Sequence, residues 1–102
     1  MSIFEQIIMQ GGCRAIGFSG DSLGTSAVTP DDFVGNEIAY PCKGLRLFNA
    51  NSDKTLYYSF DGMHWLSVPP LGELQIARSF DALYLKASGS GAVYEGEVAK
   101  AQ

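Results

Sequence analysis

Apolar and polar residues alternate with a period of two in several short segments of this chain. These segments are residues 45–47, 56–60, 74–76, 83–86 and 93–98. A period of two is that of a β-strand that buries one face. Clusters of turn-forming residues, such as 49–53 (NANSD) and 88–91 (SGSG), separate the segments. Five or six strands at this spacing predict an all-β fold, either a single small β-sandwich or a jelly-roll-like barrel.

The composition agrees with that fold class. The chain has 102 residues, which is the size of one domain, and 12 of them are glycine. Charged residues make up 18% of the chain, against about 25% in an average soluble domain. Low charge with many glycines and aromatic residues is typical of a turn-rich β protein. The start, residues 1–9, lacks the basic and apolar regions of a signal peptide, so we expect synthesis in the cytoplasm.

The amino-terminal third is rich in Gly, Ser and Asp and lacks the regular alternation of the rest of the chain, so its structure is open to more than one interpretation. We divide the chain into residues 1–37, an N-terminal arm with the first strand or strands, and residues 38–102, an antiparallel β core. The spacing of Ile3, Phe4 and Ile7 fits either a short amphipathic helix over the first turns or an exposed extended arm.

The sequence also predicts the structure of two segments that follow the first helix or arm. Residues 14–19 (RAIGFS) predict a strand. Residues 17–24 (GFSGDSLG) contain three glycines but no lysine of a phosphate-binding loop. They predict a flexible loop.

Charge and cysteine content argue against several classes of partner. The net charge is −4, and the cations are scattered singly, so we expect no nucleic-acid binding. No apolar run approaches the roughly 18 residues of a membrane span, so we expect no membrane contact. Cys13, Cys42 and His64 are the soft metal ligands, too few for a structural zinc site. We therefore expect no metal and no cofactor. The two cysteines are interpreted as buried thiols, with a disulfide as the alternative.

His64 is the one histidine, so imidazole catalysis would have to use it. Ser59 and Asp61 are close to it in sequence, yet a hairpin would not aim them into a pocket as a triad requires. We expect a protein that is not an enzyme, with no catalytic residue.

Residues 59–65 (SFDGMHW) resemble the Asp-box hairpin of sialidases and related propellers, through Ser59, Asp61, Gly62 and Trp65. In that motif the carboxylate caps the turn amides and the indole packs beneath. The chain is too short for a propeller, so the resemblance implies a well-formed hairpin only. The Asp-Gly pair predicts a two-residue type I′ turn, with residues 63–68 as the returning strand.

Large rings are predicted on both faces of the sheet, because neighbouring aromatic residues alternate along the strands. One face is the core, and the other is free to meet a sugar, a peptide or another subunit, since Tyr and Trp are enriched at interfaces. A two-layer sandwich with partly exposed tyrosines is the alternative. The candidate interface residues are Ile3, Phe4 and Ile7 in the N-terminal arm, and Tyr57, Trp65 and Tyr84 in the sheet.

The order of features from residue 38 to residue 98 resembles small all-β virion proteins of tailed bacteriophages. The resemblance is carried by residues 39–49 (AYPCKGLRLFN), 55–62 (TLYYSFDG), a Pro-containing loop with Gly72, and 82–94 (ALYLKASGSGAVY). It implies a capsid decoration or cement protein, or a head-tail or tail component, that binds other virion proteins and copies of itself as a homo-oligomer. The implied location is the virion. A carbohydrate- or receptor-binding β-sandwich module is the alternative function.

Overall fold

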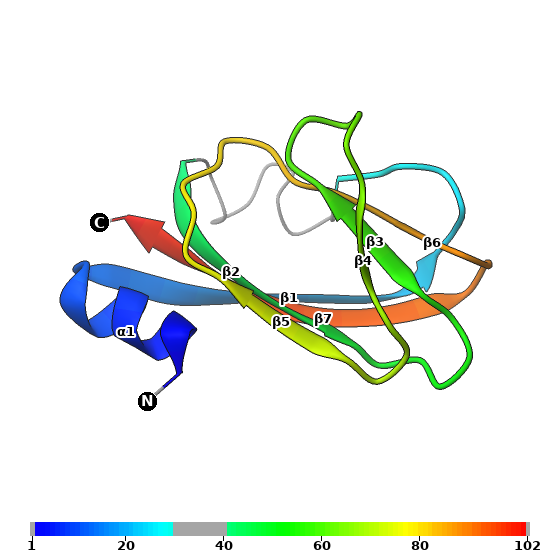
Figure 1. The fold of residues 1–102 in the computed structure, drawn as a ribbon, viewed down its shortest axis with the longest axis horizontal. Helices are drawn as coiled ribbons and strands as arrows, with labels where there is room; N and C mark the ends of the chain where they lie inside the picture. Colours follow the sequence, from blue (N-terminus) through cyan, green and yellow to red (C-terminus); the bar gives the residue numbers. More distant parts are fainter. Residues whose placement is uncertain (1, 30–40, 102) are drawn as a thin grey trace.

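The computed structural model describes residues 2–29 and 41–101, and in them two antiparallel sheets and one short helix (Figure 1). Sheet A has the strand order β1-β7-β2-β5, and sheet B has the order β4-β3-β6. The elements in chain order are α1 (Ile3–Gln10), β1 (Cys13–Leu23), β2 (Cys42–Asn49), β3 (Leu56–Ser59), β4 (Leu66–Val68), β5 (Glu73–Ile76), β6 (Tyr84–Ala87) and β7 (Ala92–Ala101). The prediction of a small all-β sandwich is confirmed.

The main core lies between the two sheets. In sheet A, Leu45 faces Val98 across the β2–β7 pair, and Leu47 faces Gly96. In sheet B, Leu56 faces Val68 on one side and Ala87 on the other. The alternating leucines of the sequence therefore point inward from both layers, as their period of two predicts. The fully buried apolar side chains of this core include Leu45, Leu47, Leu56, Leu83, Leu85, Val68 and Val98.

The N-terminal segment is the short helix rather than the extended arm. Ser2 caps it: its Oγ accepts a hydrogen bond of 3.1 Å from the amide of Glu5. The helix lies at the end of the molecule where the chain terminates (Figure 1). Phe4 is buried with Cys13 and Ala99 in a second, smaller core on the outer face of sheet A. The helix thus covers part of this face of its own sheet.

Residues 17–24 do not form the predicted loop, because β1 continues to Leu23. Gly20 in this strand makes room for a ring, and so does Gly96 in the paired strand β7. A Cβ placed on Gly20 would lie 2.5 Å from the hydroxyl of Tyr94, the residue opposite it in β7. A Cβ on Gly96 would lie 2.5 Å from the Phe18 ring across the same strand pair. Gly20 and Gly96 therefore mark close packing between β1 and β7, not flexibility.

Strand β1 ties the N-terminal region into the sheet. It pairs with β7 from Cys13 opposite Ala101 to Leu23 opposite Ala92, with a register shift after Gly20. Phe18 and Leu23 belong to the main core. The boundary between residues 37 and 38 that the sequence suggested lies outside the described residues.

Candidate functional site

Three predicted interface residues share the outer face of sheet B. Tyr57 in β3 lies opposite Lys86 in β6, and Tyr84 lies opposite Ser59 in the same strand pair. The Nζ of Lys86 is 4.2 Å from the ring centroid of Trp65 and 5.8 Å from that of Tyr57. We call Tyr57, Trp65 and Lys86 the cationic aromatic patch. Each of the three side chains is half-buried, so each presents a part of its surface to solvent.

The cationic aromatic patch borders a shallow pocket of about 510 Å³. Besides the patch, its lining includes Thr25, Leu66 and Ser67. Leu66 is 56% exposed, which is unusual for a leucine in a strand. Within residues 2–29 and 41–101, no carboxylate forms an ion pair with Lys86. The site therefore combines two aromatic side chains, the hydroxyl groups of Thr25 and Ser67, and an ammonium group that has no ion pair among the described residues.

Lys86 is the member of the patch that the sequence reasoning missed. Its signal was present, because Lys86 has the same parity as Tyr84 along β6 and so shares its face. Its position opposite Tyr57 needed the register of β3 against β6, which the sequence does not state.

The loop before β4 differs from the predicted two-residue turn. The paired residues nearest to the loop are Tyr58 and Leu66, and the returning strand begins only at Leu66. Gly62 has the expected positive φ of 77°, but Asp61 does not have one, so the turn is not type I′. The physical reason is a set of side-chain hydrogen bonds that stabilises a wider loop.

Those bonds reproduce the capping role that the Asp-box resemblance implies. The Oδ1 atom of Asp61 accepts from the amides of Met63 and His64, both at 2.8 Å. The Oγ of Ser59 accepts from the amide of Gly62 at 2.9 Å and from that of Asp61 at 3.2 Å. The hydrogen bonds that the Asp61 carboxylate accepts, those from His64 first, hold the pKa of this carboxyl well below its usual range.

The geometry of Ser59, Asp61 and His64 is that of a loop cap. Asp61 lies between the other two: Ser59 Oγ donates to its Oδ1 at 2.9 Å, and its Oδ2 is 2.5 Å from His64 Nδ1. A nucleophilic triad instead places the imidazole between hydroxyl and carboxylate. Ser59 is also buried, whereas the His64 side chain is 85% exposed.

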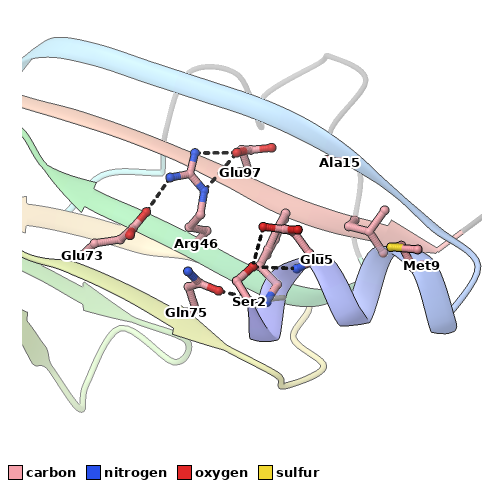
Figure 2. A pocket seen from close by; sticks show the side chains of 10 residues that line it. Ser2, Glu5, Met9, Ala15, Arg46, Glu73, Gln75 and Glu97 are labelled. Atoms are coloured by element: carbon pink, nitrogen blue, oxygen red, sulfur yellow. Dashed lines mark hydrogen bonds and ion pairs between the residues drawn. The ribbon is translucent and has the colours of Figure 1, made fainter.

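A second pocket of about 510 Å³ lies between α1 and the outer face of sheet A (Figure 2). Arg46 projects from β2 beside it and bonds carboxylates on both neighbouring strands. Its Nη1 is 2.5 Å from Glu73 Oε1, and its Nε is 2.9 Å from Glu97 Oε1. The hydrogen bond that Arg46 donates to the Glu73 carboxylate is the main cause that raises the pKa of Arg46. This cluster fastens β5, β2 and β7 together across the face.

The predicted arm residues occupy three different environments. Ile3 is 53% exposed, Ile7 is half-buried against the smaller core, and Phe4 is 4% exposed. The backbone amide of Phe4 also donates to Gln75 Oε1 at 3.0 Å, so the helix is attached to β5. Ile3 is the most exposed of the three, and its contact with another molecule stays a prediction.

Cys13 and Cys42 are free thiols, and both are buried. Burial raises the pKa of the Cys42 thiol. In residues 2–29 and 41–101, no group of three or more His, Cys, Asp or Glu side chains is placed to hold a metal ion. No helix in that part of the chain has the length and apolar character that crossing a membrane requires.

Comparison with known proteins gave no relatives. No family model matches the chain, and no curated protein and no solved structure matches it either.

Proposed function

We propose that this chain is a non-enzymatic structural protein of a tailed-bacteriophage virion, a capsid decoration or cement protein or a head-tail or tail component. It is made in the host cytoplasm and acts in the virion by protein–protein contact. The observation that carries the proposal is the cationic aromatic patch on the outer face of sheet B. The resemblance of residues 38–98 to small virion proteins supplies the biological setting.

The composition of the patch favours a protein partner. Tyr and Trp give large contact areas with little loss of side-chain entropy, and they are enriched at protein interfaces. Tyr57 and Lys86 project from paired strands, so their spacing is held by backbone hydrogen bonds. A partner that covers the patch gains the burial of two rings and gives Lys86 a place for an ion pair.

The second candidate is a carbohydrate- or receptor-binding module, because Tyr57 and Trp65 border an open pocket. A sugar would stack on a ring face. Lys86 already lies over a face of the Trp65 ring at 4.2 Å, where an ammonium group is attracted by the ring electrons. Sugar stacking on that face would have to displace Lys86, so this observation favours the protein partner.

The experiment is density-gradient sedimentation of a lysate from the cells that make the protein, with detection by antibody. We expect the chain to sediment with virus particles, and the Trp65→Ala variant to sediment with them to a smaller extent. Leu71→Ala is the matched control, because Leu71 is 61% exposed and lies outside the patch. A wild-type chain that stays entirely with the free proteins contradicts the proposal. Binding on a glycan array that Tyr57→Ala abolishes would favour the second candidate.

A further inference from the structure

The outer face of sheet A carries a patch that complements the one on sheet B. Phe48 in β2 lies opposite Glu95 in β7 and opposite Glu73 in β5. Its neighbours along β2, Leu47 and Asn49, are buried, so Phe48 points outward and is half-buried there. We call Phe48, Glu73 and Glu95 the acidic Phe48 patch. It places an aromatic ring between two carboxylates.

The two carboxylates are not equivalent. Glu73 is bound by Arg46 at 2.5 Å. Glu95 is exposed, and within residues 2–29 and 41–101 it forms no ion pair. Among the residues that the structure describes, sheet A thus presents a carboxylate without an ion pair beside a ring, and sheet B presents an ammonium without an ion pair beside two rings.

From this complementarity we infer that the chain binds a second copy of itself, with the acidic Phe48 patch of one copy on the cationic aromatic patch of the next. Lys86 of one copy pairs with Glu95 of the other, while Phe48 packs against Tyr57 and Trp65. Opposite charges at such a contact fix the register and exclude wrong partners, and the rings supply the apolar burial. The inference deepens the proposed function by naming the partner, and it rests on the premise that the chain acts by protein contact.

The two patches are on the outer faces of different sheets, and this determines the kind of assembly. The contact is heterologous, since each copy uses one patch and keeps the other free. Successive copies therefore add until a ring closes or a linear array forms. A two-fold symmetric dimer through either face would place that patch against its own copy, so it would not bring the two different patches together.

The test is the molar mass of the purified chain by light scattering over a series of concentrations. We expect mass to increase with concentration for the wild type. Lys86→Glu and Glu95→Lys each place like charges at the contact, and each is expected to weaken association at least about tenfold. The double variant Lys86→Glu with Glu95→Lys restores the opposite charges in exchanged positions, so its association is expected to return to within about threefold of the wild type.

Matched controls separate local pairing from net charge. Lys43→Glu makes the same charge change as Lys86→Glu, and Asp81→Lys approximates that of Glu95→Lys; both control residues are exposed and outside the two patches. We expect both controls to associate like the wild type. Circular dichroism checks that each variant is folded, and Lys86→Gln and Glu95→Gln are the milder replacements for any variant that is not.

Three results would overturn the inference: a wild-type chain that is monomeric at every concentration, single variants that associate normally, or a double variant that stays as weak as the singles. A monomeric chain that still sediments with virus particles overturns this inference and leaves the proposed function standing. A chain that self-associates as expected but never sediments with particles overturns the proposed function instead.

Discussion

The Nζ atom of Lys86 lies 4.2 Å from the ring centroid of Trp65, on the outer face of sheet B. A contact of this kind at an exposed site contributes about 0.5–1 kcal/mol to the free energy of unfolding. Because Trp65 is the single tryptophan of the chain, tryptophan emission reports on the surroundings of this one indole. The contribution of this contact to folding stability is small, and its position on the outer face suits it to recognition.

We expect Lys86→Met to change the emission of Trp65 and to lower the free energy of unfolding by no more than about 1 kcal/mol. Methionine keeps most of the length of the side chain and removes the charge. The measurement is the fluorescence spectrum together with urea unfolding, and Lys54→Met is the control because Lys54 pairs with Asp53 instead. An unchanged emission spectrum in Lys86→Met would show that the ammonium does not rest on the indole in solution.

Asn49 and Asn51 form a buried amide pair, and we expect its loss to be severe. Asn49 is fully buried; its Nδ2 donates to the carbonyls of Lys54 and Val68, and its Oδ1 accepts from the side chain and backbone of Asn51. Asn49→Ala removes these four hydrogen bonds, while the Asn51 side chain keeps its bonds to Val93, and each buried group left unsatisfied costs about 1–3 kcal/mol. Urea unfolding is expected to show a loss of about 3 kcal/mol or more. Ser52→Ala, in the same loop and exposed, serves as the control and is expected to change little.

The lowered pKa of Asp61, which caps its loop, makes folding stability decrease at acidic pH. The folded-state pKa of Asp61 is lowered, so its contribution to stability is complete above its ordinary pKa of about 3.9. That contribution is lost as the pH falls below about 4 toward the lower folded-state pKa. We expect Asp61→Asn to have a lower thermal midpoint than the wild type at pH 5, with the difference narrowing toward pH 2. Asp53→Asn is the control, and an Asp61→Asn difference that is constant from pH 5 to pH 2 would contradict this account.

Gly20 and Gly17 lie on the same strand and are predicted to respond differently to alanine. A Cβ on Gly20 would overlap the Tyr94 ring, whereas the nearest atom to a Cβ on Gly17 is the carbonyl oxygen of Gly96 at 3.8 Å. Overpacking of this kind typically costs about 1–3 kcal/mol, so Gly20→Ala is expected to lower the free energy of unfolding by that amount. Gly17→Ala is expected to be neutral or stabilising by up to about 1 kcal/mol. In a double-mutant cycle, Gly20→Ala should lower the free energy of unfolding less in the Tyr94→Leu background than in the wild type. Equal losses in both backgrounds would contradict the overlap with the ring.

Several features of the fold were predicted from the sequence because they depend on local pattern. The alternation around Leu45 and Leu47 indicated a strand with one buried face, and the structure confirms it. The helical spacing of Phe4 and Ile7 gave a short helix as one of two alternatives for the N-terminus, and the structure has the helix. The Asp-box resemblance indicated that the Asp61 carboxylate caps the loop amides, which it does.

Two other predictions were wrong because the same local pattern can have more than one physical cause. Glycine at positions 17–24 signals flexibility in isolation, but in this sheet Gly20 leaves space for a ring from β7. The Asp-Gly pair favours a two-residue turn, but the side chains of Ser59 and Asp61 accept hydrogen bonds from the amides of a wider loop. In both cases contacts made by the folded chain outweigh the preference of the short segment.

The sequence alone determined the class of fold, because the period of two and the turn residues act over a few neighbouring positions. It also supplied the aromatic residues of the candidate interface. The pairing of β3 with β6, which places Lys86 beside Tyr57, and that of β2 with β7, which places Glu95 beside Phe48, were decided only by the tertiary structure. Strand order and register depend on how distant segments bury their apolar faces together, and a one-residue slip would turn every one of these side chains to the opposite face.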